Sequence, residues 1–79
     1  MPGTSRRSAS ASLGEEIWRV HVNHVWWSCE LRFHGESYGW EAQILRDGDL
    51  SFSQRWLLRD LAVQWADEQR RLKERGFQN

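Results

Sequence analysis

The stretch HVWWSCELRFHG, from His24 to Gly35, decides the fold of this chain. From Trp27 to His34 apolar and polar residues alternate strictly, the apolar ones being Trp27, Cys29, Leu31 and Phe33. A period of two residues is typical of a strand with one buried and one exposed face. Because neighbouring side chains on a strand point to opposite faces, Trp26 and Trp27 cannot enter the same core.

Two further segments show the same alternation and predict two more strands. Segment 40–44 follows the turn-like sequence GESYG at 35–39, and segment 50–55 follows RDGD at 46–49. The Asp-Gly pair inside RDGD is a strong signal for a hairpin turn. Together with the first strand, these segments predict an antiparallel meander.

The register of the meander follows from keeping the apolar residues on one face. The first hairpin then pairs Phe33 with Trp40, Leu31 with Ala42, Cys29 with Ile44 and, on the outer face, Arg32 with Glu41. In the second hairpin, an Asp-Gly turn of two residues would place Ile44 opposite the polar Ser51. We expect a bulge or a third loop residue that pairs Ile44 with Phe52 instead, because burial outweighs turn preference.

After Trp56 the apolar period changes to 3.6 residues, which predicts one amphipathic helix over 57–75. Its apolar stripe is Leu58, Leu61, Ala62, Trp65, Gln69 and Leu72. The basic run that ends in Gly76 suits the last turn and the C-cap of a helix. No capping residue directly precedes Leu57, and Ser53 is a candidate N-cap if the helix begins early.

Segment 18–22 also alternates, with Trp18, Val20 and Val22 as its apolar residues. Two arrangements remain open: a fourth strand at the edge of the sheet, or a loosely attached N-terminal segment. Whether this segment covers Trp26 or leaves it exposed is open as well. Either way the predicted fold class is α+β, a three- or four-stranded antiparallel meander followed by one long C-terminal helix packed on one sheet face.

Length and composition predict one small domain. The chain has 79 residues; we expect a disordered tail over 1–15, where small polar residues prevail, and a single domain over 16–79. The basic SRRSASAS sequence in this tail is either a contact arm or a solvated leader. The predicted core consists of Trp27, Leu31, Phe33, Trp40, Ile44, Phe52, Leu61 and Trp65.

The charges and motifs exclude several function classes. Eleven basic and eleven acidic residues balance, so no global field favours nucleic acid or a membrane surface. A single cysteine and the lack of an apolar leader predict a cytoplasmic protein, and no apolar run approaches a membrane span. His21 and His24 lie near Cys29, but four ligands at zinc spacing are missing. We therefore expect no metal, no cofactor and no catalysis.

The order of the strands and the helix, joined by RDGDLSFSQRWLLRDLAVQWADEQRR at 46–71, resembles the arm domains of phage integrases. It is more loosely similar to double-stranded-RNA-binding domains. The resemblance covers Val25 to Arg75 in order and pattern. It implies a nucleic-acid-binding module that uses its sheet face and the basic end of its helix.

Two binding functions are therefore predicted, with a protein-interaction module ranked before a nucleic-acid module. The predicted outer sheet face mixes acidic and basic residues, and the surplus of Trp and Arg is typical of interface hot spots. Leu45 and Val63 also fall on the faces opposite the core. The expected partner is another protein or a second copy of the chain, with nucleic acid as the alternative and no membrane. The candidate binding residues are Trp26, Arg32, His34, Arg55, Trp56, Arg70 and Arg71.

Overall fold

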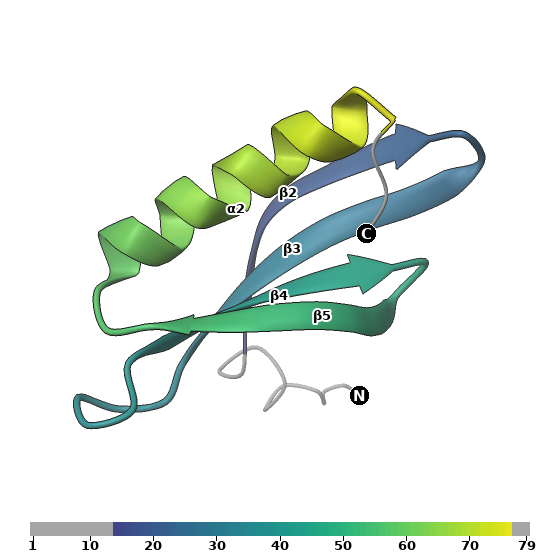
Figure 1. Ribbon diagram of the computed structural model, residues 1–79. Helices are drawn as coiled ribbons and strands as arrows, with labels where there is room; N and C mark the ends of the chain where they lie inside the picture. Colours follow the sequence, from purple (N-terminus) through teal and green to yellow (C-terminus); the bar gives the residue numbers. More distant parts are fainter. Residues whose placement is uncertain (1–13, 77–79) are drawn as a thin grey trace, which may run out of the picture.

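The computed structural model describes residues 14–76, which form four strands and one helix (Figure 1). These are β2 (Glu15–Val22), β3 (Val25–Phe33), β4 (Trp40–Arg46), β5 (Asp49–Trp56) and α2 (Arg59–Glu74). The strands form one antiparallel sheet in the order β2-β3-β4-β5, and α2 lies across one of its faces. The predicted α+β meander is confirmed, with four strands.

Segment 18–22 is part of the first strand of this sheet. β2 begins at Glu15, the last residue of the predicted tail, and residues 1–13 lie outside the described part of the chain. Asn23 and His24 join β2 to β3 with φ angles of 52° and 68°. Two successive positive φ angles are typical of the tight hairpin turn whose twist matches the flanking strands.

The observed registers confirm both predicted hairpins. β3 and β4 pair Phe33 with Trp40 and continue in step through the remaining predicted pairs. In the second hairpin, Asp47 and Gly48 form the turn, with φ angles of 51° and 89°. A bulge follows at Ile44 and Leu45, so that Ile44 pairs with Phe52. The bulge thus allows both the preferred turn and the burial of the apolar side chains.

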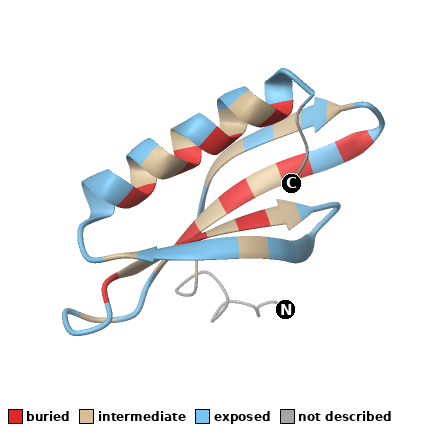
Figure 2. Ribbon diagram, viewed as in Figure 1, coloured by how far each residue is buried: buried red, intermediate tan, exposed pale blue. Residues whose placement is uncertain are grey.

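The core lies between α2 and the two central strands (Figure 2). Its buried apolar residues are Val25, Trp27, Cys29, Leu31, Ala42, Ile44, Ala62 and Ala66. The prediction of the core is wrong for two residues: Phe33 is 54% exposed and Leu61 is 41% exposed. Phe33 is the last residue of β3, where the Trp40 ring packs against its ring at a centroid distance of 4.7 Å and a tilt of 42°. The other predicted core aromatics, Trp40, Phe52 and Trp65, are partly buried against the core.

The stripe that the helix turns toward the sheet only partly matches the predicted one: Ala62 and Gln69 belong to both, whereas Leu58 and Leu61 are exposed. Its buried residues are Ala62, Ala66, Gln69 and Lys73, which share one face at helical spacing. The two alanines allow close approach to the sheet, and the Trp18 indole nitrogen donates a hydrogen bond of 2.9 Å to the Ala66 carbonyl. Val63, predicted to face away, packs against the core.

The ends of α2 also differ in detail from the prediction. Leu58 occupies the N-cap without a side-chain hydrogen bond, and Ser53 lies within β5, so it does not cap the helix. Arg75 is the C-cap, and Gly76 follows it with a φ of 91°. The Gly76 N–H donates to the Lys73 carbonyl at 2.9 Å, as in a helix that ends on a left-handed glycine.

Candidate interaction surface

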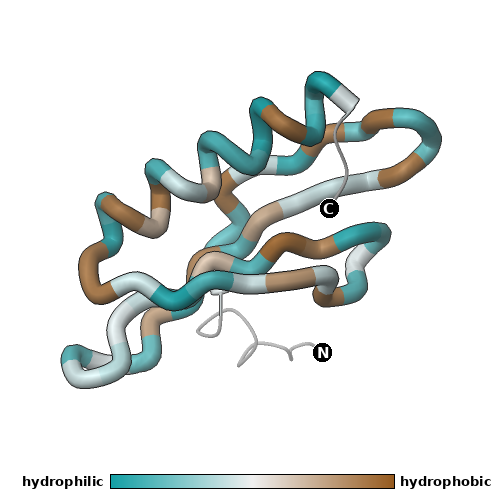
Figure 3. The backbone as a smooth tube through the Cα atoms, in the orientation of Figure 1, coloured by the Kyte–Doolittle hydropathy of each residue, from teal (hydrophilic) through white to brown (hydrophobic). Residues whose placement is uncertain are grey.

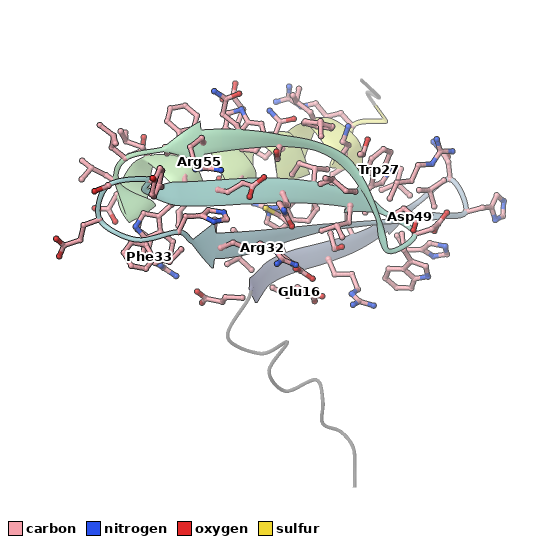
Figure 4. All side chains as sticks on the ribbon, turned by 90° about the horizontal axis from the view of Figure 1, so that it is seen from below. Glu16, Trp27, Arg32, Phe33, Asp49 and Arg55 are labelled. Carbon is pink, nitrogen blue, oxygen red and sulfur yellow. The ribbon has the colours of Figure 1, made fainter. Side chains whose placement is uncertain are left out.

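The sheet face opposite α2, called the open face below, carries mostly polar side chains (Figure 4). Strand alternation and cross-strand pairing determine which residues lie on it. They are Glu16, Arg19, His21, Trp26, Ser28, Glu30, Arg32, Glu41, Gln43, Leu45, Leu50, Ser53 and Arg55. One end of the open face is apolar and aromatic, whereas the other end is charged.

Trp26 lies at the apolar end and is 47% exposed. Its cross-strand partner is His21, whose ring stacks on the indole at a centroid distance of 4.5 Å and an angle of 13°. The Arg19 guanidinium lies 5.9 Å from the Trp26 ring centroid. β2 therefore supports the indole from the side and does not cover it.

The backbone around Trp26 is fixed by the second hairpin turn. The Trp26 N–H donates to the Asp47 carboxylate at 3.0 Å, and the Asp47 N–H donates to the Trp26 carbonyl at 2.7 Å. A shallow hollow beside the indole is lined by Arg19, Trp26, Ser28, Asp47 and Gly48. The backbone of Trp26 is thus held in place by the second hairpin turn.

Two leucines extend the apolar end across the sheet. Leu45 pairs with Leu50 on the open face, and Leu50 is 58% exposed. Simple alternation with Phe52 predicts Leu50 on the core side, but the bulge at Ile44 and Leu45 moves it to the other face. We name the set Arg19, His21, Trp26, Leu45 and Leu50 the Trp26 surface.

At the charged end of the open face, neighbouring side chains bond to one another. Arg32 donates to Gln43 at 2.8 Å and lies 3.5 Å from Glu30, and His34 lies 2.8 Å from Glu41. Burial opposes the charge of Glu41, but hydrogen bonds from His34, Ser53 and Gln43 hold its pKa below the ordinary value. Arg32 and Glu41 are therefore already bonded to neighbouring side chains of the same chain.

Arg55 completes this end of the open face. It pairs across the strands with Glu41, and its guanidinium donates to the Tyr38 carbonyl at 3.3 Å. The structure thus brings three predicted site residues, Arg32, His34 and Arg55, to one end of the open face. Trp26 lies at the other end of the same face.

The predicted basic pair on the helix lies away from the open face and is also ion-paired. Arg70 contacts Asp67 at 2.8 Å and Glu74 at 3.0 Å, and Arg71 contacts Asp67 as well. These ion pairs raise the pKa of Arg70 and lower that of Asp67. Arg70 and Arg71 therefore do not join the sheet-face cations into one basic surface.

Trp56, the remaining predicted site residue, faces the helix side of the sheet. Its ring lies 6.4 Å from that of Trp65, and it packs against the core. Its indole N–H is buried without a hydrogen-bond partner in the described part of the chain. The structure therefore separates Trp56 from Trp26 and places the two on opposite faces.

The one cysteine of the chain, Cys29, is buried in the core. Burial and the neighbouring Glu30 charge raise the pKa of the Cys29 thiol to about 12, so the thiol is protonated at neutral pH. Within residues 14–76, no group of three or more His, Cys, Asp or Glu side chains could hold a metal ion. Nor does the described part of the chain contain a helix with the length and apolarity needed to cross a membrane.

Lys73 is the one strongly buried cation among the described residues. The residue is 1% exposed, and its ammonium lies 4.1 Å from the Trp27 ring centroid and 5.1 Å from that of Phe52. It has no hydrogen-bond partner in the described part of the chain. Loss of hydration on burial lowers the pKa of Lys73.

Replacing Lys73 with methionine is expected to raise the free energy of unfolding at pH 7 by about 1 kcal/mol. The substitution removes a buried unpaired polar group, which costs about 1–3 kcal/mol or more when charged, and loses a cation–π contact of about 0.5–2 kcal/mol. The pKa of Lys73 is lower in the folded chain than in the unfolded chain. Between these two pKa values the unfolded chain therefore binds more protons than the folded chain does. As a result, the free energy of unfolding of the wild type increases as the pH rises toward 10.5.

Urea denaturation of wild type and Lys73→Met at pH 7 and pH 10 would measure this effect. The difference between the two proteins should shrink at the higher pH, because Lys73 then loses its charge. The exposed cation Arg75 provides the control, since Arg75→Met should leave the pH dependence unchanged. Equal pH dependence of wild type and Lys73→Met would contradict the burial of the charge.

Comparison of the chain with protein-family models, with curated proteins and with solved structures gave no match.

Proposed function

We propose that this chain is a small protein-interaction module without catalytic activity, and that it binds its partner through the Trp26 surface. The observation that carries the proposal is the exposed indole of Trp26, held by a stacked histidine and a nearby arginine. Tryptophan and arginine are enriched among the residues that contribute most to protein interfaces.

The surroundings of Trp26 support a protein partner. Leu45 and Leu50 extend its apolar surface, and the charged end of the open face provides a polar rim. A central apolar anchor with polar groups around it is the usual anatomy of a protein interface. The expected partner therefore presents an apolar pocket or cleft for the indole and polar groups for the rim.

The pairing of charges supports a protein partner over nucleic acid. Binding to nucleic acid requires basic side chains that neutralise its phosphates and so release the counterions bound to them. Arg32, Arg70 and Arg71 instead contact carboxylates of this same chain. A nucleic acid would have to displace these carboxylates, so nucleic-acid binding ranks second.

Replacing Trp26 with alanine is expected to weaken binding of the partner about thirty-fold, since loss of a hot-spot tryptophan costs about 2 kcal/mol. Affinity capture with the immobilised full chain would supply candidate proteins, and titration of each against wild type and Trp26→Ala would measure the loss. Tyr38→Ala is the matched control, because Tyr38 is another exposed aromatic residue, 67% exposed and outside the Trp26 surface.

Two outcomes would contradict the proposal. One is that Trp26→Ala binds every captured protein as tightly as the wild type does. The other is that random DNA or RNA duplexes bind at low salt, with affinity that falls steeply as salt increases and is lost when Arg70 and Arg71 are changed to alanine. The second outcome would identify a nucleic-acid-binding module instead.

A further inference from the structure

β5 forms an edge of the sheet and is exposed along most of its length (Figure 2). Only Phe52 and Trp56 are partly buried in this strand. Between these two residues the strand contains neither proline nor lysine, the residues that commonly protect an edge from pairing with another chain. Its one charge there, Arg55, lies on the open face and does not block the edge.

The opposite edge, β2, is protected in several ways. It carries Glu15, Glu16 and Arg19, and its pairing with β3 is interrupted by a bulge between Glu16 and Trp18. An ion pair of 3.1 Å between Glu15 and Arg59 ties β2 to the helix. Charges and bulges are the devices by which natural sheets avoid pairing at an edge. The two edges of this sheet therefore differ in their readiness to accept another strand.

The helix does not fully cover the aromatic residues on its side of β5, just as it leaves the apolar residues of β2 partly exposed. Neighbouring strands lie about 4.8 Å apart and a helix is about 10 Å across, so one helix covers roughly two strands. Phe52, Trp56 and Trp65 are accordingly only partly buried. At the start of the helix, Leu58 is 62% exposed and Leu61 is 41% exposed, and Figure 3 shows this apolar start of α2.

We propose that β5 pairs antiparallel with β5 of a second copy of the chain, about a two-fold axis that passes Gln54. The partners then place Phe52 opposite Trp56 of the second copy, Ser53 opposite Arg55 of the second copy, and Gln54 opposite Gln54. Aromatic pairs across strands are favourable, and no like charges face each other directly. The paired segment, Phe52 to Trp56, contains no residue of the Trp26 surface, whose Leu50 lies earlier in β5.

The register follows from which side chains share a face. Residues opposite each other in an antiparallel pair point to the same side of the sheet. The bulge disrupts alternation at Ser51, so Phe52 to Trp56 is the regular part of the strand. A two-fold axis at Gln54 pairs this whole segment with the same segment of the second copy. An axis at a neighbouring residue would pair only a shorter part of it. The chain has eleven basic and eleven acidic residues, so no net charge repels a second copy.

A charge exchange at Gln54 tests this pairing. Sedimentation equilibrium of the full chain should show a dimer, and Gln54→Lys and Gln54→Glu should each raise the dimer dissociation constant at least about tenfold, because like charges meet at the axis. An equal mixture of the two variants should recover a dimer, since opposite charges then face each other. Gln64→Lys is the matched control, because it makes the same substitution at an exposed helix position.

Each variant should first be shown to be folded by its circular dichroism and urea denaturation. Hydrogen exchange of wild type is a second measurement that needs no variant: the β5 amides should become more protected as protein concentration rises. A wild type that stays monomeric at high concentration, or a Gln54→Lys chain that dimerises like wild type, would overturn the proposal. Loss of the dimer in Trp26→Ala would instead identify the open face as its interface. A dimer that persists in Trp26→Ala would support pairing through β5. The proposed function is then decided separately, by the binding titrations of Trp26→Ala.

Discussion

Replacing Trp27 with alanine is expected to reduce the free energy of unfolding by about 3–5 kcal/mol, which approaches the whole stability of a domain this small. Trp27 is 2% exposed in a central strand, and both Arg46 and Lys73 lie over its ring. The substitution would leave a large cavity and remove the aromatic ring beside the buried ammonium. Urea denaturation followed by circular dichroism would measure the loss.

Trp26→Ala is the matched control for this prediction, because it removes the same side chain from the neighbouring position on the other face. It should reduce the free energy of unfolding by less than about 1 kcal/mol, since surface substitutions usually have small effects. Equal losses for the two variants would mean that the assignment of the two sheet faces is incorrect.

Gly39→Ala is expected to reduce the free energy of unfolding by about 2–4 kcal/mol. Gly39 has a φ of 74°, and a Cβ atom there would lie 2.3 Å from the Trp56 carbonyl oxygen and 3.0 Å from the Leu57 Cα. The positive φ alone costs a residue with a Cβ about 1–2 kcal/mol. The clash adds to this, because backbone atoms of the β5–α2 connection would have to move.

Gly48→Ala separates these two contributions. Gly48 also has a positive φ, of 89°, but a Cβ atom there would meet nothing within 4 Å. This variant should therefore lose only about 1–2 kcal/mol, the cost of the backbone conformation. Thermal or urea denaturation of both variants would give the comparison, and equal losses at the two glycines would contradict the close approach at Gly39.

β3, β4 and β5 and the registers between them were predictable because their causes are local, whereas the sequence left open whether β2 forms a strand. Alternation of apolar and polar residues assigned the faces of β3 and β4, and the Asp-Gly pair located the second turn. The bulge that brings Ile44 opposite Phe52 was predictable from burial. Its effect on Leu50 was not, because simple alternation with Phe52 places Leu50 on the core side of the sheet.

The candidate site was only partly predictable. Trp26 followed from the parity of β3, but its support by His21 depends on the register between β2 and β3. The basic residues Arg70 and Arg71 were visible in the sequence, whereas their pairing with Asp67 depends on side-chain positions along the helix. Charge counts alone do not distinguish a basic surface from a set of ion pairs.

By itself, the sequence determined the order of β3, β4, β5 and α2, the registers of the two hairpins that join these strands, and the opposite faces of Trp26 and Trp27. Only the tertiary structure decided which stripe of α2 meets the sheet, and hence that Lys73 is buried while Leu61 is exposed. The physical reason is that strand faces follow from neighbouring residues, whereas the rotation of a helix follows from its contact with the whole sheet. Small side chains at Ala62 and Ala66 allow the closest approach there, and that contact outweighs the position of the larger leucines.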